Sequence, residues 1–206
     1  MSFIKTFLVV FLVLATSVAS AKVHEVWVAR YDGAGNSGDR ANALAVDADG
    51  NVYVTGQSRG TGYNDDYATV KYAPNGDTVW VRRYSGPGNY PDRANALALD
   101  AAGNVYVTGE SYVSTRYYDY ATLKYDADGN ELWAARYNGP EDQSDIANAV
   151  AVDGSGNVYV TGYASCSGGS VDYATIKYDP NGDTLWVRFY GGAYNGEDYA
   201  YDLAVD

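Results

Sequence analysis

Short stretches of alternating apolar and polar residues follow one another along this chain, separated by clusters of Gly, Asp, Asn and Pro. Four of them, at residues 41–47, 52–55, 66–72 and 79–84, have the period-two pattern and the β-branched and aromatic content of strands. The sequences ADGN at 48–51 and PNGD at 74–77 place a glycine where a left-handed residue closes a tight hairpin. No part of this unit has helical spacing, so the pattern predicts four antiparallel strands.

The four-stranded unit recurs along the chain without insertion or deletion. The segment GNVYVTG stands at 50–56, 103–109 and 156–162. The tryptophans keep the same period of 53 residues, at Trp27, Trp80, Trp133 and Trp186. A fixed period of this length with strand-like content is the signature of a repeat architecture.

Side-chain size indicates how the units are arranged. The first strand of the unit carries Ala41, Ala43 and Ala45, whereas the fourth strand carries Trp, Arg and Tyr. Sheets that surround an axis crowd together near it and splay apart at the rim, so small residues belong inside. We therefore predict an all-β fold, a β-propeller of four-stranded antiparallel blades with the first strand innermost. A solenoid or an array of small sheets is the second choice.

The repeats do not divide the chain evenly. Three complete units at 41–84, 94–137 and 147–190 are preceded by a strand of the fourth type at 26–31 and followed by one of the first type at 200–206. Because propellers typically need about four to eight blades to close, we expect three complete blades plus one incomplete blade. This is a partial or truncated propeller, or one that closes with another chain. Open strand edges invite pairing, so we also expect self-association through open blade edges.

The repeated motifs resemble a known family. The combination of DxxGNVYVTG, DYATxKY, GDTxWVRRY and DRANALAVD is similar to the bacterial β-propeller repeats labelled SBBP, whose pattern is related to NHL-type repeats. The resemblance covers residues 22–206 and implies a propeller of exported or surface proteins, often one module of a larger protein. It implies no catalytic residues, because the family has no general catalytic assignment.

The N-terminus has the features of an export signal. Lys5 precedes an apolar run at 7–15, and the small residues Ala19-Ser20-Ala21 follow it, which predicts a secretory signal peptide at 1–21. The run is short for a membrane-spanning helix, so an uncleaved anchor is the weaker alternative. We expect a secreted or cell-surface protein, extracellular or periplasmic, with no membrane insertion after cleavage.

Composition narrows the function classes. With 26 acidic and 14 basic residues the formal net charge is −12, which argues against a nucleic-acid partner because phosphates require the opposite balance. Cys166 is the only cysteine, so no intramolecular disulfide forms. We interpret it as an incidental residue in a loop of small residues.

Catalytic and metal-binding chemistry find little support. The only histidine, His24, lies near the expected mature terminus, where a catalytic group would lack a scaffold. The segment 47–51 resembles a calcium loop, but its equivalents at 100–104 and 153–157 lack the second carboxylate, which favours turn chemistry. We expect no cofactor, no metal and no catalytic residue.

Charged residues that recur in register indicate structural parts of the blade, such as an inter-blade ion pair or a loop cap. These residues are Asp66, Asp119 and Asp172, Lys71, Lys124 and Lys177, and Arg30, Arg83 and Arg136.

Differences between the repeats are concentrated in two sets of connections. One set joins the second strand to the third, at 57–64, 110–118 and 163–171, and the other joins consecutive units, at 32–39, 85–92, 138–145 and 191–198. Alternate connections of an antiparallel sheet leave by opposite ends, so both sets share one variable loop face. Tyr and Arg are favoured at recognition surfaces, and the candidate binding residues are Arg59, Tyr63, Tyr90, Arg116, Tyr117, Tyr118, Tyr163 and Tyr194. The alternative is that they are ordinary loop residues in a chain with 22 tyrosines.

The sequence favours a non-enzymatic, exported propeller module that uses the variable loop face for binding or assembly. The expected partner is a protein or a glycan at the cell surface. The alternative function is a fragment of a propeller-type enzyme, a lyase or glycan hydrolase, whose catalytic residues lie in other blades.

Overall fold

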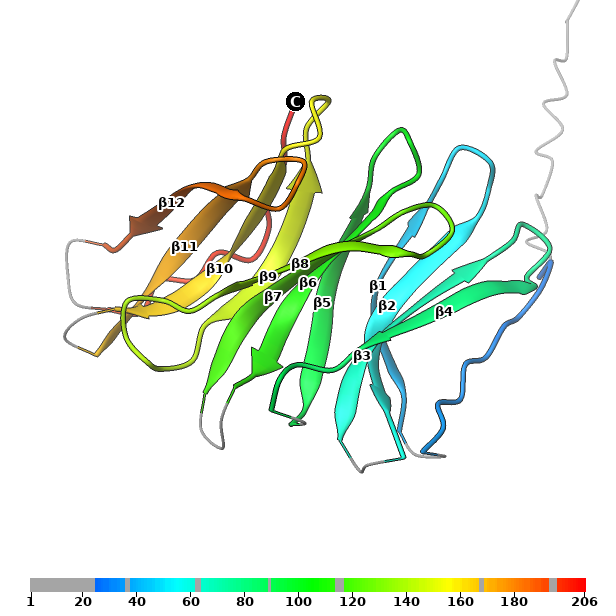
Figure 1. Ribbon diagram of the computed structural model, residues 1–206, viewed down its shortest axis with the longest axis horizontal. Coiled ribbons are helices and arrows are strands. Elements are labelled where there is room, and N and C mark those ends of the chain that lie inside the picture. The colour runs from blue at the N-terminus through cyan, green and yellow to red at the C-terminus, as the bar shows by residue number, and fades with distance from the viewer. Residues whose placement is uncertain are drawn as a thin grey trace, which may run out of the picture.

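The protein folds as three separate four-stranded β-sheets that stand side by side in chain order (Figure 1). The computed structural model describes residues 25–35, 38–61, 64–88, 90–113, 117–166, 169–192 and 196–206, and it contains no helix within these ranges. The expected signal peptide at 1–21 and His24 lie outside the described residues.

Each sheet has its strands in chain order, and every neighbouring pair is antiparallel. The first blade consists of β1 (Arg40–Val46), β2 (Val52–Arg59), β3 (Asp65–Tyr72) and β4 (Thr78–Tyr84). The second blade consists of β5 (Asp92–Leu99), β6 (Val105–Tyr112), β7 (Tyr118–Tyr125) and β8 (Glu131–Tyr137). The third blade consists of β9 (Ile146–Val152), β10 (Val158–Cys166), β11 (Ser170–Tyr178) and β12 (Thr184–Tyr190). This confirms the all-β prediction of four-stranded propeller blades, and the sheets do not close into a ring.

The two tight hairpins of each blade form as the sequence predicts. Gly50 and Gly76 have φ angles of 82° and 88°, the left-handed conformation that glycine adopts without steric cost. The carboxylate of Asp47 accepts hydrogen bonds from the backbone N–H groups of Asp49 and Asn51, at 3.0 and 2.8 Å. These contacts fix the turn, so the acidic loop serves the hairpin as expected.

The first strands lie innermost, as their small residues predict. β5 contacts β1, β2 and β3 of the preceding blade, and β9 contacts β5, β6 and β7. Asn42 donates from its side-chain amide to the carbonyl oxygen of Ala94 at 2.8 Å, and Asn95 donates to Ala147 at 2.9 Å. Hydrogen bonds between first strands therefore connect the blades near the axis.

The hydrophobic core lies between blades rather than within one sheet. One cluster joins Tyr53, Tyr67 and Trp80 of the first blade to a set from the second blade that includes Val107 and Leu123. A second cluster joins the second and third blades in the same way. Each blade therefore needs a neighbour to bury its faces, as in other repeat architectures.

Two expectations about the strands need correction. Residues 26–31 and 200–206 are not strands, since neither segment forms a ladder with a described strand. β2 runs to Arg59 instead of stopping at residue 55, since Ser58 and Arg59 pair with Asp66 and Asp65. Cys166 likewise ends β10 and pairs with Ser170 instead of lying in a loop.

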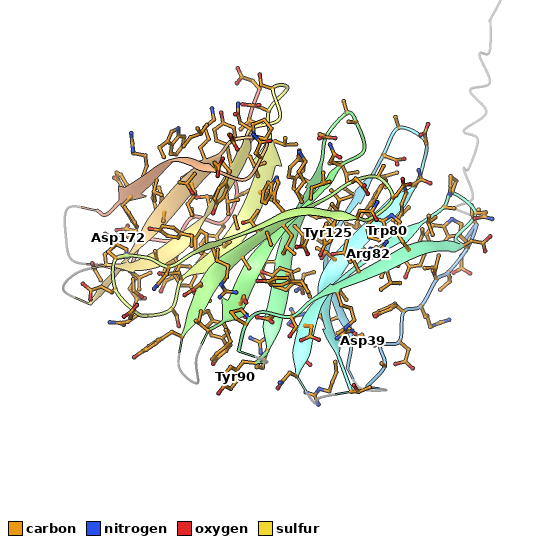
Figure 2. All side chains as sticks on the ribbon, viewed as in Figure 1. Asp39, Trp80, Arg82, Tyr90, Tyr125 and Asp172 are labelled. Atoms are coloured by element: carbon orange, nitrogen blue, oxygen red, sulfur yellow. The ribbon has the colours of Figure 1, made fainter. Side chains whose placement is uncertain are left out.

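Two ends of the blades can now be distinguished. The hairpin end carries the β1–β2, β3–β4 and equivalent turns, and the variable end carries the β2–β3 and β4–β5 connections and their equivalents. The hairpin end is at the top of Figure 1, and the labelled Tyr90 lies at the opposite edge in Figure 2.

Candidate binding site

A shared aspartate at the start of each blade holds the variable end together. One carboxylate oxygen of Asp92 accepts a hydrogen bond from the N–H of Gly86 at 2.6 Å, and the other accepts from the N–H of Tyr112 at 3.1 Å. Asp145 makes the equivalent contacts with Gly139 and Ser165. Burial raises the pKa of Asp145 to about 6, although these backbone hydrogen bonds oppose the shift. The aspartates thus fix where each variable connection begins.

A second shared feature is an arginine on the fourth strand that donates to several side chains at once, which we call the arginine fork. It occurs at Arg83 in the first blade and at Arg136 in the second. Arg136 donates to the carboxylate of Asp119 at 3.3 Å, to the hydroxyl of Ser111 at 2.6 Å and to the hydroxyl of Tyr84 at 3.1 Å. Because Tyr84 belongs to the preceding blade, the fork joins two blades. Arg83 makes the same set of contacts with Asp66, Ser58 and Tyr31.

The recurring charged residues are therefore structural, as the sequence analysis expects. The ion pair lies within a blade and joins Asp to Arg, as in the Arg83–Asp66 pair at 3.0 Å. The lysines do not pair with these aspartates: Lys71 donates to the carbonyl oxygen of Ala127 in the next blade at 3.1 Å. In the third blade Phe189 replaces the arginine, so Asp172 has no such fork.

Three positions at the variable end differ between blades, although the first of them is arginine in two of the three blades. They are the start of the first strand, the end of the second strand and the start of the third strand, and cross-strand pairing places them next to one another. The three sets are Arg40, Gln57 and Asp65; Arg93, Glu110 and Tyr118; and Ile146, Tyr163 and Val171.

The first blade presents a polar cluster at these positions. Asp65 accepts hydrogen bonds from the side-chain amide of Gln57 at 2.9 Å and from the guanidinium of Arg59 at 3.2 Å.

The second blade presents an aromatic cluster around an ion pair in which the carboxylate is buried and the guanidinium is partly exposed. Arg93 donates to Glu110 at 2.8 Å, and Glu110 is 6% exposed. Burial raises the pKa of Glu110, and the Arg93 guanidinium only partly offsets this. The rings of Tyr112 and Tyr118 lie edge to face with centroids 3.8 Å apart, and Tyr90 lies 6.0 Å from Tyr112. This side of the variable end combines broad aromatic surfaces with one paired carboxylate.

The third blade continues the aromatic surface. The ring of Tyr163 lies 4.9 Å from that of Tyr199, which follows the last variable connection. Burial raises the pKa of Tyr163 to about 12, and the negative charge of Glu110 adds to the effect. The second and third blades therefore meet in one region near the axis.

A hollow opens beside the aromatic cluster, between two variable connections. It has a volume of about 350 Å³ and is lined by Val113, Tyr117, Asp119, Asn138, Asp142 and Gln143. Tyr117 is 36% exposed, whereas Asp119 at the base is 8% exposed. An exposed ring next to amide and carboxylate groups can pack against an apolar surface and hydrogen-bond at the same time.

Comparison with known proteins identifies the repeats. A family model described as "SBBP: Beta-propeller repeat" matches residues 27–64 and 132–165. Both stretches are similar to this β-propeller repeat. Each match runs from a fourth-strand position through the first strand of the next blade into its second strand. Each match thus spans the connection between a fourth-strand position and the next blade.

A more distant similarity agrees with this fold. An uncharacterised WD repeat-containing protein of Acanthamoeba polyphaga mimivirus is 26% identical over 180 residues, which cover 79% of this chain and 10% of that protein. The chain therefore spans about a tenth of the length of this relative.

The structure places five of the eight candidate residues at the variable end of the blades. Arg59, Tyr118 and Tyr163 lie in strands instead of loops, which corrects the expectation, because the strands extend further than the sequence pattern shows. Tyr90 and Tyr117 lie in connections. The five do not form one cluster: Arg59 belongs to the first blade, and Tyr117 lines the hollow. Tyr63, Arg116 and Tyr194 lie outside the described residues.

Sequence reasoning missed four residues of this surface: Arg93, Glu110, Tyr112 and Tyr199. Aligning the repeats position by position would have revealed Glu110, Tyr112 and Tyr199, because each differs from its equivalents in the other blades, whereas Arg93 has the same residue, Arg40, in the first blade.

Metal binding finds no support in the part of the chain that is described. No group of three potential ligands from His, Cys, Asp and Glu occurs there. Within the same residues, no helix is long and apolar enough to cross a membrane.

Proposed function

We propose that this chain is an exported, non-enzymatic β-propeller module that binds a partner at the cell surface through the variable end. One observation carries the proposal: shared Asp and Arg contacts fix the backbone of the variable end, while two neighbouring positions, at the end of the second strand and the start of the third, carry a different side chain in each blade. A rigid scaffold with unshared side chains is the usual construction of a recognition surface.

Among cell-surface partners, the hollow favours a glycan over a protein. It offers the exposed ring of Tyr117 with the polar side chains of Asn138, Asp142 and Gln143 around a volume of about 350 Å³. Small-ligand sites have this combination of a packing surface and a few placed polar groups. A protein partner would instead need the broader aromatic surface around Tyr112 and Tyr118.

The non-enzymatic part of the proposal follows from the partners of the buried carboxylates. Glu110 is paired with Arg93, and Asp119 is paired with Arg136. A general acid or base needs a free route to a substrate proton, and both carboxylates are instead used by the scaffold. Burial raises the pKa of both carboxyl groups, and the arginine partners offset only part of this shift.

The binding test uses a glycan array and the purified exported chain. We expect retention of a glycan without release of product, and at least a tenfold loss of affinity in Tyr117→Ala and Asn138→Ala, the order of effect of removing a central contact. Tyr201→Ala is the matched control, because Tyr201 is 73% exposed and lies outside the hollow. Binding that survives both hollow variants, or an array without any retained glycan, contradicts a glycan partner. Release of a smaller sugar contradicts the non-enzymatic assignment.

The predicted export of the protein is tested separately. Expression of the full chain in a bacterial host, followed by mass spectrometry of the exported fraction, should give a protein that begins at Lys22. A chain retained in the membrane at full mass contradicts export as a soluble module.

A further inference from the structure

Each blade has two different faces, and the interior junctions show how they fit. We call the face towards the following blade the trailing face and the face towards the preceding blade the leading face. On the first blade the trailing face includes Tyr53, Tyr67, Lys71 and Trp80, which pack against the leading face of the second blade, including Val105, Val107, Leu123 and Tyr125. In Figure 2 the labels of Trp80, Arg82 and Tyr125 gather at this junction.

Apart from the Arg136–Tyr84 contact, the side-chain hydrogen bonds across a junction run from the trailing face to carbonyl oxygens of the leading face. Tyr67 donates to Ala121 and Trp80 donates to Ala127, each at 3.1 Å. Arg82 also donates to the carbonyl oxygen of Gly129. The second junction repeats the Tyr, Lys and Trp bonds one period later, from Tyr120, Lys124 and Trp133 to Ala174 and Pro180.

The trailing face of the third blade carries the same donors in the same geometry. Arg188 lies 5.7 Å from the centre of the Trp186 ring, as Arg82 does from Trp80. Lys177 lies 4.8 Å from the ring of Tyr159. Among the described residues no following blade supplies the carbonyl oxygens that these donors reach elsewhere. Tyr190 is correspondingly 56% exposed.

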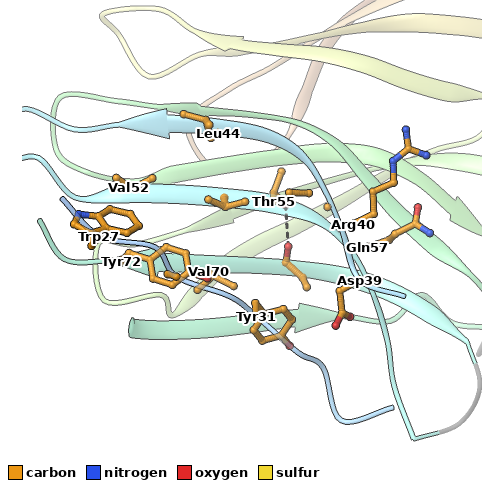
Figure 3. Close-up of a pocket in the computed structure, with 15 residues that line it drawn as sticks. Trp27, Tyr31, Asp39, Arg40, Leu44, Val52, Thr55, Gln57, Val70 and Tyr72 are labelled. Atoms are coloured by element: carbon orange, nitrogen blue, oxygen red, sulfur yellow. Dashed lines mark hydrogen bonds between the residues drawn. The ribbon is translucent and has the colours of Figure 1, made fainter. Parts of the chain in front are cut away.

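The leading face of the first blade is the complementary open surface. A groove of about 400 Å³ there is lined by apolar residues that include Leu44, Val52 and Val54 (Figure 3). Leu44 is 67% exposed, whereas its equivalent Leu97 packs against the first cluster. Of the side-chain donors in the described residues, Thr55 donates to the carbonyl oxygen of Ala68, while both Thr108 and Tyr67 donate to the equivalent oxygen of Ala121.

The terminal segments each fill the place of a single strand. Trp27 donates to the carbonyl oxygen of Pro74 at 3.0 Å, as Trp80 does to Ala127. At the other end, Asn148 donates to the carbonyl oxygen of Ala200 at 2.8 Å. Figure 3 shows Trp27 and Tyr31 across the groove from Val52 and Val70. Each segment therefore covers part of an open face and leaves the middle of it exposed.

We propose that the trailing face of the third blade docks on the leading face of the first blade in a second copy of this chain, in the register of the two interior junctions. Trp186 and Tyr190 then take the positions of Trp27 and Tyr31, and Arg83 of the second copy donates to the Tyr190 hydroxyl. In this arrangement β12 replaces the segment 26–31 and β1 replaces the segment 200–206, and each makes the contacts of the segment that it replaces. The net gain is therefore the burial of the middle strands.

A second copy is the occupant that the structure itself specifies. The donors and the carbonyl oxygens of the two open faces already meet in this register at both interior junctions. The contact is heterologous, since two different faces meet, and two copies bring six complete blades, within the range in which propellers close. The inference concerns the end faces and does not depend on ligand binding at the variable end.

The test is the mass of the full exported chain by sedimentation velocity and native mass spectrometry, from the low micromolar range upward. We expect dimers or longer head-to-tail chains, favoured by added salt because each copy has a formal net charge of −12. Leu44→Glu on the leading face and Arg188→Glu on the trailing face should each weaken association at least tenfold. Leu132→Glu is the matched control, because Leu132 is 52% exposed and belongs to neither open face.

Mixing the two variants distinguishes a heterologous contact from any symmetric one. Leu44→Glu keeps a normal trailing face and Arg188→Glu keeps a normal leading face, so their mixture should form one-to-one dimers that grow no further. Circular dichroism of each variant checks folding, which these exposed sites should leave intact. A wild type that stays monomeric at every concentration overturns the proposal. Association that is unchanged in both variants, or no pairing in the mixture, overturns it as well.

Discussion

The same residue at the same position of three blades allows one perturbation to be made in different surroundings. Val54, Val107 and Val160 are equivalent, and Val107 and Val160 are both 0% exposed between two blades. Val54 lines the groove on the leading face of the first blade and is partly exposed. Valine to alanine removes the same two carbons at each site, so any difference in cost comes from the neighbouring blade.

The magnitude follows from burial. Removing two buried carbons costs about 1.6 kcal/mol at about 0.8 kcal/mol per methylene, and an enclosed cavity raises the total to about 2–3 kcal/mol. This applies to Val107→Ala and Val160→Ala. At Val54 the open groove leaves no enclosed cavity and water already reaches the side chain, so we expect about 1 kcal/mol or less.

The assay is urea unfolding of dilute protein, followed by tryptophan fluorescence and circular dichroism. Repeat arrays can unfold in stages, so free energies are compared only where both transitions coincide. In thermal melts the two interior variants should lose about 2–4 °C per kcal/mol. An equal loss at Val54 and Val107 in dilute monomer would refute the idea that the leading face is open. If copies associate as proposed, Val54→Ala should become more costly as the concentration rises.

Three further predictions concern the scaffold of the blades. Burial raises the pKa of Asp145 to about 6 in the folded state, so this carboxyl adds stability below about pH 4 that is lost as the pH rises through about 6. Relative to the non-titrating Asp145→Asn variant, the wild type's unfolding free energy should fall by about 1–3 kcal/mol across this window, and a flat difference in urea titrations would contradict the raised pKa. In Gly109→Ala the new Cβ would lie 2.0 Å from a backbone carbonyl oxygen of β5, so thermal melts should show a loss of about 3 kcal/mol or more. In Gly154→Ala the new Cβ has no other atom within 4 Å, so stability should change by less than about 0.5 kcal/mol. Similar losses in the two glycine variants would mean that the packing around Gly109 is not tight. Arg136→Ala leaves Asp119, 8% exposed, without its partner, which should cost about 2 kcal/mol by denaturant unfolding, and an unchanged midpoint would show that the fork contributes nothing.

Most of the fold could be read from the period of the sequence. The strand order, the antiparallel pairing and the inner position of the first strand depend on contacts between neighbouring strands and on turns such as Gly50 and Gly76, which are local. Contacts between neighbouring strands depend on residues close together in the sequence, so they can be recognised from a short sequence pattern. Because the pattern occurs three times, the strands and turns can be assigned from it without ambiguity. The candidate site was less predictable, because Glu110 and Tyr112 fall in the connection expected at 110–118, and only the strand pairing of β6 brings them against Arg93 and Tyr118.

The sequence by itself therefore determined the repeating unit, its turns and the end of the blades where the repeats differ. Only the tertiary structure decided which of several identical residues are buried. Leu44 and Leu97 have the same neighbours in sequence, yet one is 67% exposed and the other packs between two blades. Arg82 and Arg188 lie over their tryptophans in the same way, and within the described part of the chain Arg82 also donates to the carbonyl oxygen of Gly129 in the following blade. Burial and hydrogen bonding across a junction depend on a blade that is distant in sequence, and no pattern within one repeat records whether that blade is there.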